Sequence, residues 1–469
     1  MDTPVIALFD IGKTNKKLFL IDEHYRIVLE KTEQFAETTD EDGEPCEDLA
    51  QLTNWILNAF KAVSEDKSFD IQAVNFSAYG ASFVHLDTEG LPVGPLYNYL
   101  KPLSEVLKRQ FYEHNGGEAA FSRQSASPVL GNLNSGMQIY RLKYEKPELF
   151  EKIKYSLHLP QYLSFLLTNK TYSDITSIGC HTNLWNFDTN QYADWVGEEK
   201  ILDKLPPIFP CDEVINIMPE GETMMASFVG GNDHILKVGI GLHDSSAALI
   251  PYLSSFQESF VLISTGTWCI SMNPFNDEPL TDFELENDCL CYMTYQGKPV
   301  KAARLFAGFD HEEQTKRIAQ YFNVASDFYK TIAFDPHIID ILRGRNQRIE
   351  RGYVAATVRS ASVFGQRDLA DLESIEFAYH QLMLDIVAQQ VASTRLVLLS
   401  KTPVLRIFVD GGFSKNSIYM NLLARQFPDL EVFAASVAQA TAIGAALAIH
   451  QHWNTLAVPS HLIELKYYA

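Results

Sequence analysis

The sequence has little positive charge for its length. It holds 38 Lys and Arg residues against 59 Asp and Glu residues, which gives a formal net charge of -21 over 469 residues. Proteins bind nucleic acids and anionic membranes mainly through basic patches. The composition therefore opposes both as partners. Backbone N–H groups at a turn or a helix start remain able to hold a local anion such as a phosphate.

Cysteine is also scarce, with six residues in the chain. None forms a C-x-x-C pair, and none lies at zinc-finger spacing from histidine, so we expect free thiols in a reducing compartment. The opening residues MDTPVIALFD lack the basic and apolar segments of a secretory signal. No uncharged apolar run approaches the ~18 residues that a membrane span needs. The sequence predicts a cytoplasmic protein.

The first hundred residues are typical of a mixed α/β domain. Apolar runs at 5–9, 17–21 and 26–29 are joined by short connections, which predicts three antiparallel strands. Apolar residues then recur at three- and four-residue steps over 47–66, which predicts an amphipathic helix. Another strand follows, then a loop at 78–82 and a further strand. The region 95–230 is expected to be mostly helical and to form a lid-like substrate region.

The opening pattern returns near residue 260. The segment ESFVLISTGTWCISMNP again predicts strand, turn and strand, and LFDIGKT can be laid over LISTGTW with Gly12 matching Gly266. A long helix is expected over 374–400, followed by a strand, a helix, a strand and an Ala-rich helix over 437–451. Two such βββαβα halves would bring the turns at Gly12 and Gly266 face to face across a cleft.

The turn DIGKTNKK follows a buried strand and ends the strand in Asp10. It is neither a P-loop nor a G-x-G-x-x-G motif, because an apolar strand follows it rather than a helix. A glycine in such a hairpin lets backbone N–H groups approach a phosphate, and Lys13 or Lys17 would neutralise a transferring phosphoryl group. A hairpin with solvated lysines is an equally good interpretation. The turn STGTW at 264–268 offers hydroxyls and backbone donors, and a plain turn is its alternative.

The segment VDGGFSKN at 409–416 is more specific. A predicted strand ends in Asp410, two glycines allow close backbone approach, and a helix is expected to start near Asn416. Helix starts of this kind favour a nucleotide phosphate or a nucleoside. The alternative is a connection in which glycine serves only the turn geometry.

The segment GIGLHDSSAALIP at 239–251 places His243 and Asp244 between the two halves. Asp at a helix start is most often an N-cap. If the halves close on a substrate, the same carboxylate would take the proton of an attacking hydroxyl. His243 is as consistent with a buried, hydrogen-bonded histidine as with a ligand contact.

The order of these motifs resembles that of the FGGY carbohydrate kinases, over nearly the whole chain. DIGKTNKK is similar to the family's first phosphate motif, GLHDSSAAL to its catalytic-aspartate segment, STGTW to its second phosphate motif and VDGGFSKN to its adenosine motif. HDSSA, STGTW and FVHLD are most similar to the L-rhamnulokinase and L-fuculokinase members. The resemblance implies an α/β fold of two ribonuclease-H-like domains, of the actin-like superfamily that holds sugar kinases, hexokinases and Hsp70. These domains, 1–243 on the sugar side and 244–469 on the nucleotide side, would flank a cleft.

The resemblance also implies roles for individual residues. Asp244 is the general base, and Asp10 and Asp244 hold Mg²⁺. The residues expected to bind ATP are Lys13, Thr14, Asn15, Lys17, Gly266, Thr267, Gly411, Gly412 and Asn416. The residues expected to bind the sugar are Gly80, Ser82, His243, Ser245 and Arg304.

Three positions depart from the family pattern. Lys13 stands where the family has a small residue, and it would either pair with the γ-phosphate or crowd it. Ser82 stands where rhamnulokinases carry a sugar-binding Asp, so a charged acceptor is lost. The family's later Lys-Asn segment has no Asn here, and Arg304 is a candidate substitute.

The predicted function is therefore ATP-dependent phosphorylation of a ketose, with a deoxyketohexose such as L-rhamnulose or L-fuculose as substrate. The alternatives are a kinase for another ketose or polyol of the xylulose, ribulose or glycerol type, and a degenerate sensor that binds sugar and nucleotide without turnover. An Hsp70-like ATPase is disfavoured, because the remaining sequence shows no separate peptide-binding domain. The partners are small molecules, and a homodimer is left open.

Overall fold

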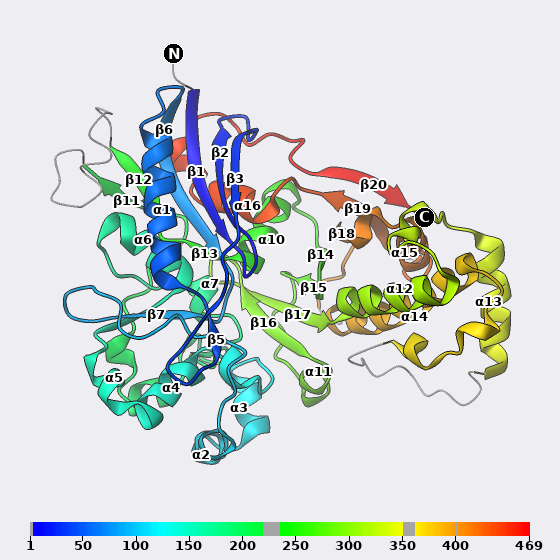
Figure 1. Cartoon of the computed structure of the whole chain (residues 1–469), viewed down its shortest axis with the longest axis horizontal. Helices are drawn as coiled ribbons and strands as arrows, with labels where there is room; N and C mark the ends of the chain where they lie inside the picture. Colours follow the sequence, from blue (N-terminus) through cyan, green and yellow to red (C-terminus); the bar gives the residue numbers. More distant parts are fainter. Residues whose placement is uncertain (1–2, 219–234, 350–361, 399–400) are drawn as a thin grey trace. The chain divides into compact units, whose positions relative to one another are not determined.

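The computed structural model describes residues 3–218, 235–349, 362–398 and 401–469 (Figure 1). Contacts divide the chain into two compact units. Unit 1 comprises Met1–Ser255, Cys291–Pro299 and Ala438–Leu462, and unit 2 comprises Phe256–Leu290, Val300–Val437 and Ile463–Ala469. The predicted division into kinase domains at 243 and 244 stays a prediction. It did not foresee that residues near the C-terminus belong to unit 1.

The main sheet of unit 1 has the strand order β11-β12-β6-β1-β2-β3, and β13 also pairs with β6. Its strands are β1 (Thr3–Ile11), β2 (Lys16–Asp22), β3 (Ile27–Glu33), β6 (Phe69–Ala78), β11 (Val214–Ile217), β12 (Leu236–Gly239) and β13 (Leu242–His243). The first three strands form the predicted antiparallel meander, and β6 runs parallel to β1. The predicted antiparallel pairing of the first three strands is therefore confirmed. The short connections explain it, since a turn of a few residues can join only antiparallel neighbours.

Strand β1 is buried on both faces, which explains its continuous apolar run. Val5, Ala7 and Phe9 belong to the same core cluster as residues of helix α1 (Leu49–Ser64) and helix α6 (Leu159–Thr168). Side chains alternate along a strand, so the intervening residues face the opposite side. Helix α16 (Ala440–Ala448) contacts both β1 and β6 there, and it packs along helix α10 (Asp244–Ser255).

A mostly helical region follows the first core, as predicted. Its second cluster of buried residues includes Phe111, Tyr140 and Trp195, whose rings pack edge to face. The elements of this region and of the short hairpins before it are β4 (Thr38–Thr39), β5 (Pro45–Cys46), β7 (Phe83–Leu86), α2 (Glu105–His114), α3 (Glu118–Gln124), α4 (Gly136–Glu145), α5 (Pro147–Lys152), β8 (Tyr155–His158), α7 (Ile175–Ile178), β9 (Trp185–Asn186), β10 (Gln191–Tyr192) and α8 (Asp194–Glu198). The short helix α17 (His450–Trp453) follows α16 in the chain and contacts β6. Residues 219–230 of the predicted helical region lie outside the described residues.

A second sheet, of order β16-β17-β15-β14-β18-β19-β20, repeats the meander. Its residues belong to unit 2, except for Cys291–Met293 of β16 and Pro299 of β17, which belong to unit 1. Its strands are β14 (Phe260–Thr265), β15 (Cys269–Asn273), β16 (Cys289–Met293), β17 (Pro299–Leu305), β18 (Arg406–Gly411), β19 (Glu431–Ser436) and β20 (Glu464–Tyr468). Strand β14 pairs antiparallel with β15 and parallel with β18, just as β1 pairs with β2 and β6. The predicted internal repeat is therefore present at the level of strand pairing.

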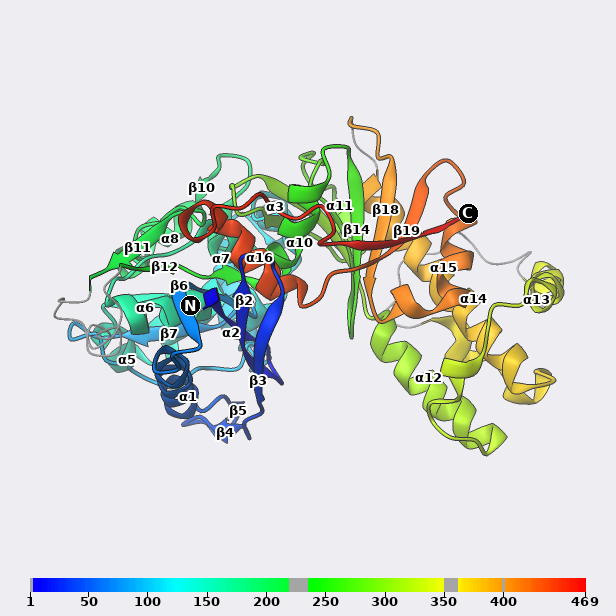
Figure 2. The ribbon, with the colours of Figure 1, turned by 90° about the horizontal axis from the view of Figure 1, so that it is seen from above.

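Helices α12 and α14 pack against each other in unit 2, and α14 also contacts β15 and α15 (Figure 2). The helices are α11 (Asp282–Glu286), α12 (Ala307–Phe322), α13 (Pro336–Ile349), α14 (Ile375–Leu398) and α15 (Ser417–Ala424). The predicted helix 374–400 corresponds to α14, and its last two residues lie outside the described residues. Helix α14 is buried nearly all round, which is typical of a helix enclosed by other elements.

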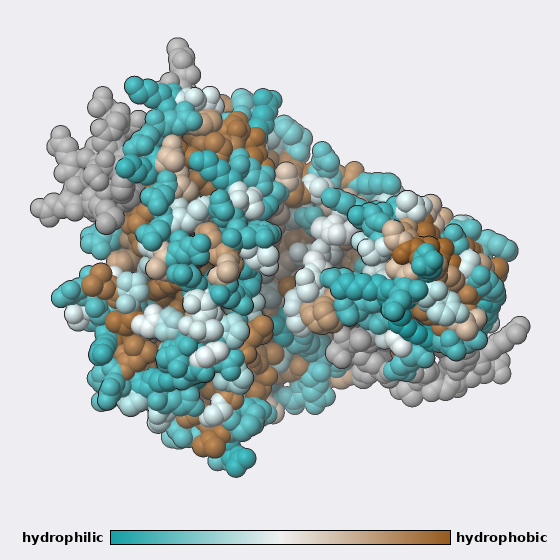
Figure 3. All heavy atoms as spheres, in the orientation of Figure 1, coloured by the Kyte–Doolittle hydropathy of each residue, from teal (hydrophilic) through white to brown (hydrophobic). Residues whose placement is uncertain are grey.

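On the face seen in Figure 3, hydrophilic side chains cover most of the surface and separate the apolar ones into patches. Among the described helices, none has the length and apolar character to span a membrane.

Candidate active site

Two carboxylates lie at the end of the central strand of unit 1. Asp10 is near the end of β1, and the alternation of that strand turns it to the face where α10 and α16 pack. Thr441, in the first turn of α16, donates a hydrogen bond from Oγ1 to Asp10 Oδ2 at 2.8 Å. Asp244 is the first residue of α10, and its charge acts on Asp10. The structure thus brings together the two residues predicted for catalysis and metal binding.

Asp244 is held in place from its own helix. Its Oδ1 accepts hydrogen bonds from the Ser245 N–H at 2.6 Å and from the Ser245 hydroxyl at 3.2 Å. About a third of the side chain is exposed, since its relative accessibility is 34%. Burial nevertheless raises the pKa of Asp244 to about 6, against the lowering effect of the Ser245 hydrogen bonds. A carboxylate with a raised pKa that still reaches solvent suits a general base.

His243 lies directly beside the predicted base. Its Nε2 is 3.2 Å from Asp244 Oδ1. Burial lowers the pKa of His243 to about 4, so the imidazole is neutral at physiological pH and the contact is not an ion pair. Its Nδ1 has no hydrogen-bond partner among the described residues, although it is buried. An unpaired buried polar atom of this kind is costly unless a ligand satisfies it.

The same two carboxylates fit a hydrated Mg²⁺ ion. Burial raises the pKa of Asp10 to about 6, and the neighbouring negative charge of Asp244 adds to the shift. A divalent cation would favour the ionised form of both groups. Within the described part of the chain, no group of three or more His, Cys, Asp or Glu side chains could hold a metal ion by itself. One or two carboxylates, completed by water and substrate phosphates, are the usual protein site for Mg²⁺.

The first predicted phosphate hairpin is a tight turn between β1 and β2. Gly12 N–H donates to Asn15 O at 2.9 Å, and Thr14 and Asn15 are exposed at its tip. Lys13 Nζ lies 3.0 Å from Glu37 Oε1 and 5.8 Å from the centroid of the Tyr79 ring. The ammonium group of Lys13, which departs from the family pattern, is therefore paired with residues of unit 1.

Lys17 pairs with Asp10 in the β1–β2 register. Its Nζ lies 3.3 Å from Glu30 Oε1 and donates to Gln439 Oε1 at 3.4 Å, just before α16. The positive charge of Lys17 lowers the pKa of Asp10 in part. Lys17 is only partly exposed and lies close to the carboxylates, as expected for a residue that neutralises phosphate.

The loop expected to face the sugar is fixed against the base. A Cβ on Gly80 would lie 2.7 Å from His243 Nε2, so only glycine allows this approach. Ala81 has a φ of 61°, which is unusual for a residue with a side chain, and Gln138 Nε2 donates to its carbonyl at 2.6 Å. Ser82 is buried next to it. Strain of this kind is often found where a backbone is positioned for function.

The second predicted phosphate hairpin, in unit 2, is also closed by a backbone hydrogen bond from its glycine. Gly266 N–H donates to Trp268 O at 2.9 Å, as Gly12 does to Asn15. Helix α12 starts against this turn, where Phe309 N–H donates to Thr267 O at 3.2 Å. A Cβ on Gly308 would lie 1.8 Å from Gly266 O, so the helix start and the turn are in direct contact.

The glycine pair after β18 is clamped by one threonine. Gly411 has a φ of 90°, and Gly412 N–H donates to Thr265 O at 2.9 Å. The Thr265 hydroxyl donates to Asp410 O at 2.5 Å and accepts from Phe413 N–H at 3.0 Å. Gly411 thus serves the turn geometry, whereas a Cβ on Gly412 would meet only Thr265 O, at 4.0 Å. The predicted contact of both glycines with a nucleotide stays a prediction.

A cavity of about 590 Å³ opens between these two turns of unit 2. Its walls include the aromatic rings of His311, Tyr329 and Phe413, with His311 packed edge to face against the other two. Burial lowers the pKa of His311 to about 4, which keeps its ring neutral. Lys330, Lys415 and Asn416 add polar groups to the walls. A cavity that combines aromatic walls with a few polar groups is the usual form of a small-ligand site.

Asn416 lines this cavity, and its hydrogen bonds also hold two of the surrounding elements in place. Its Oδ1 accepts from the N–H groups of Ile418 and Tyr419 at 3.0 Å each, so it caps helix α15 as the sequence predicts. Its Nδ2 donates to the Tyr379 hydroxyl at 2.6 Å, and this hydroxyl also contacts His311 Nε2 at 3.0 Å. One amide N–H of Asn416 is left for a ligand.

Arg304 is the one predicted sugar residue that belongs to the other unit. It lies in unit 2, whereas Gly80, Ser82, His243 and Ser245 lie in unit 1. Its Nη2 donates to Asp288 Oδ1 at 2.6 Å, and its guanidinium stands 5.2 Å from the centroid of the Trp268 ring. Its role toward the sugar stays a prediction.

Sequence reasoning missed several residues of these sites. Thr441 contacts Asp10 and Gln439 contacts Lys17, although more than 400 residues separate the members of each pair. No local sequence pattern predicts such a contact. Tyr329 lies outside the recognised motifs, and His311 lies in the later Lys-Asn segment, where only Arg304 was predicted to act. The only sequence feature that pointed to Thr441 was the Ala-rich helix that contains it, because a helix of small residues can pack closely against another element.

Solved structures of sugar kinases share the fold. Solved structures with this fold are similar over nearly the whole chain. They include a carbohydrate kinase from Novosphingobium aromaticivorans (TM-score 0.77, 21% identity, 100% of this chain and 94% of that chain). They also include a ligand-bound xylulose kinase from Lactobacillus acidophilus (TM-score 0.77, 17% identity, 99% and 93%) and a Plasmodium falciparum glycerol kinase with ADP (TM-score 0.71, 16% identity, 96% and 90%).

The chain belongs to the FGGY family of carbohydrate kinases. Residues 5–251 match the family's N-terminal domain, and residues 257–336 match its C-terminal domain. Among curated proteins it is similar to a rhamnulokinase from Mannheimia succiniciproducens, with 24% identity over 60% of this chain and 57% of the relative. A rhamnulokinase from Oceanobacillus iheyensis is 23% identical over 48% and 46%. The matches thus span about half the length of these relatives.

Proposed function

We propose that this protein is an ATP-dependent kinase that phosphorylates a hydroxyl group of a ketose, with L-rhamnulose and L-fuculose as the first candidates. The observation that carries this proposal is the pair of carboxylates, Asp10 and Asp244, beside the phosphate hairpin of unit 1. Family membership and the rhamnulokinase relatives support the same activity.

In this proposal Asp244 takes the proton from the sugar hydroxyl as its oxygen attacks the γ-phosphorus, and ADP leaves. The N–H groups of the two hairpins and the Nζ of Lys17 stabilise the charge on the transferred group. Asp10 and Asp244 would hold Mg²⁺, which neutralises phosphate charge when bound. The cavity lined by His311 and Phe413 receives the nucleoside. His243 and the loop at Gly80 orient the sugar.

The contacts of Lys13 favour an active kinase over a degenerate sensor. Lys13 extends toward Glu37 and Tyr79, so its side chain has a place that leaves the turn itself free for phosphate. Asp10, Asp244 and both hairpins are retained together, and a protein that only binds has no need of the base. The second candidate is a kinase for another ketose or a polyol, since similar structures are named xylulose kinase and glycerol kinase.

A coupled ADP-release assay with Mg·ATP tests this proposal. The panel contains L-rhamnulose, L-fuculose, both enantiomers of xylulose and ribulose, D-fructose and glycerol. We expect turnover on one ketose far above the rest. Turnover on glycerol alone would favour the polyol alternative. Bound ATP with no turnover on any member would oppose the kinase role and favour the sensor.

The pH dependence of turnover should report the base. The pKa of Asp244 is raised to about 6, and the carboxylate is the active form, so activity is high above this pH and lost below it. We expect kcat/KM to fall by up to about tenfold per pH unit on the acid side. Bound Mg²⁺ should move this fall to a pH below 6, because the cation favours the ionised carboxylate. The measurement runs from about pH 5 to pH 8 at constant ionic strength and constant free Mg²⁺. A flat profile to the acid end would contradict the role of Asp244.

A further inference from the structure

Lys16 differs from the other lysines of the first hairpin, because it is buried. Its relative accessibility is 1%, whereas the side chains of Lys13 and Lys17 are 28% and 22% exposed. A buried ammonium group needs a partner for each of its N–H donors. Lys16 Nζ forms an ion pair with Glu47, and it donates to Gly12 O at 3.1 Å and to Lys13 O at 2.9 Å. All three donors are therefore used inside the protein.

The two carbonyls that Lys16 binds belong to the phosphate turn itself. The C=O and N–H of a trans peptide point in opposite directions. Holding Gly12 O and Lys13 O inward therefore turns the N–H groups of Lys13 and Thr14 away from the buried ammonium. Thr14 is exposed, so these N–H groups face the outer side of the turn. Successive N–H groups aimed the same way form an anion-binding concavity.

Glu47 connects this turn to the loop at the base. It follows β5 in the chain and is 8% exposed. One oxygen takes the Lys16 ion pair, and the other accepts a hydrogen bond from the Tyr79 hydroxyl. Tyr79 N–H in turn donates to Ile11 O at 3.0 Å, at the end of β1. Tyr79 directly precedes Gly80, which packs on His243 beside the base.

We propose that Lys16, Glu47 and Tyr79 form a positioning group that fixes the N–H donors of the first phosphate turn and joins this turn to the sugar loop. Lys16 is then a positioning residue and binds no phosphate. This inference rests on the proposed function, in which the turn receives the terminal phosphates of ATP.

If these three residues act in this way, variants should affect the melting temperature and the binding of phosphate separately. Removing one charge, as in Lys16→Met, leaves Glu47 buried without its partner and lowers the melting temperature. The double variant Lys16→Met/Glu47→Gln removes both charges, so most of the melting temperature should return. The carbonyls of Gly12 and Lys13 remain without their donor in the double variant, and the phosphate turn stays loose.

Calorimetric titration measures this separation without any turnover. The probes are the non-hydrolysable β,γ-imido analogue of ATP with Mg²⁺, and AMP, which lacks the terminal phosphates. For the double variant we expect analogue binding at least about tenfold weaker and unchanged AMP binding, because a lost charged hydrogen bond is worth about 1.5–3 kcal/mol, or roughly 10- to 150-fold. Normal analogue binding in the double variant would overturn the proposal and leave Lys16 a purely structural residue.

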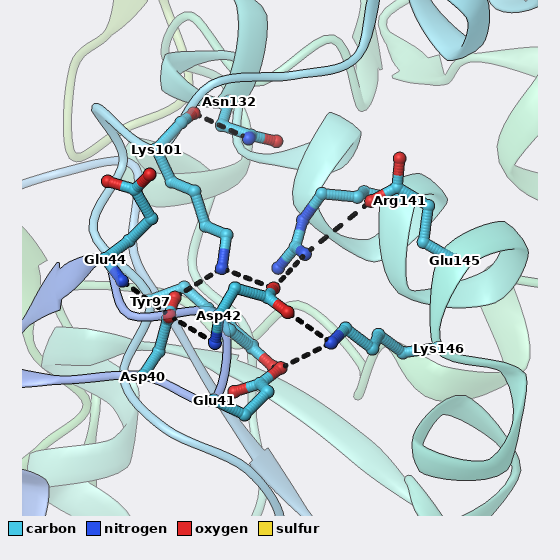
Figure 4. Close-up of polar contacts among 10 residues, drawn as sticks. All are labelled: Asp40, Glu41, Asp42, Glu44, Tyr97, Lys101, Asn132, Arg141, Glu145 and Lys146. Carbon is cyan, nitrogen blue, oxygen red and sulfur yellow. Dashed lines mark hydrogen bonds and ion pairs between the residues drawn. The ribbon is translucent and has the colours of Figure 1, made fainter.

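A second buried ion pair, whose carboxylate also comes from the β4–β5 hairpin region, provides the matched control. Lys101, which is 8% exposed, forms an ion pair with Asp40 and donates to Asp42 at 2.7 Å, in a cluster that also holds Arg141 and Lys146 (Figure 4). The variant Lys101→Met/Asp40→Asn removes this pair from the β4–β5 hairpin without touching the phosphate turn. We expect unchanged analogue binding. An equal loss in this control would show general loosening of the segment and overturn the proposal.

Tyr79→Phe tests the connection to the sugar loop. It removes the hydroxyl that donates to the Glu47 carboxylate and keeps the ring. We expect near-normal analogue binding and a KM for the sugar raised about tenfold, the lower end of the effect of losing one hydrogen bond to a charged group. Unchanged sugar KM and kcat would contradict the connection. The proposed function is tested separately by the wild-type chain. If wild type binds the analogue no more tightly than AMP, the terminal phosphates do not meet this turn, and both proposals fail.

Discussion

Replacing Asp244 by Asn is expected to lower kcat by at least about 100-fold, the usual size of a general-base effect. Asn keeps the shape of the side chain, and its carbonyl oxygen still accepts the Ser245 hydrogen bonds. It has no basic lone pair for the proton of the sugar hydroxyl. The cavity that we propose for the nucleoside is lined by residues of unit 2 alone, so the affinity for ATP should stay nearly unchanged.

The measurement combines steady-state turnover on the best ketose with titration of ATP in the absence of sugar. Asp194→Asn is the matched control, since Asp194 is also the first residue of a helix, α8, and is exposed. It should leave both quantities unchanged. Near-normal turnover of Asp244→Asn would remove the role of Asp244 as base.

Replacing Gly308 by Ala should distort the turn at Gly266, which we propose to hold phosphate. The new Cβ would lie 1.8 Å from Gly266 O and 3.0 Å from Thr267 O, far inside van der Waals contact with backbone that cannot rotate away. The turn or the start of α12 must then move. Overpacking of this kind costs about 1–3 kcal/mol of unfolding free energy. A displacement of about 1 Å in a group that positions phosphate costs on the order of 100-fold in turnover.

Thermal melting and kcat at saturating sugar measure the two effects. Gly344→Ala is the matched control, because a Cβ at Gly344, in α13, meets no atom within 4 Å. Removing a glycine from a helix interior should stabilise the protein by about 0.5–1 kcal/mol and leave turnover unchanged. Full activity of Gly308→Ala would show that the turn at Gly266 does not position phosphate.

Much of the fold could be predicted, because the local patterns are strong. The apolar run at 5–9 and its short connections determine the meander of β1, β2 and β3, and the return of that pattern near Gly266 predicts β14 and β15. The spacing of Leu52, Ile56 and Phe60 identifies α1, whose buried residues are those of the expected face. The start of α15 after Asn416 also agrees with prediction.

The rest depends on contacts that no local pattern contains. The Ala-rich helix at 437–451 was assigned with the second half of the chain, yet α16 packs in unit 1. Its Gly444 allows this, since a Cβ there would lie 1.8 Å from Ala247 O of α10. The sequence did not distinguish Lys16 from Lys13 and Lys17, because all three are lysines of one hairpin. Lys16 is buried in an ion pair only because Glu47, 31 positions away, lies beside it. That the turns at Gly12 and Gly266 face each other stays a prediction.

Phosphorus NMR of the reaction tests the central claim most directly. Mg·ATP is incubated with the ketose that gives the fastest ADP release, for the wild-type chain and for Asp244→Asn. If the protein is a sugar kinase, a phosphomonoester signal should rise in step with ADP in the wild type and be nearly absent in the variant. Inorganic phosphate in place of the phosphomonoester would contradict the account, because it would show an ATPase whose site does not deliver the γ-phosphate to a sugar.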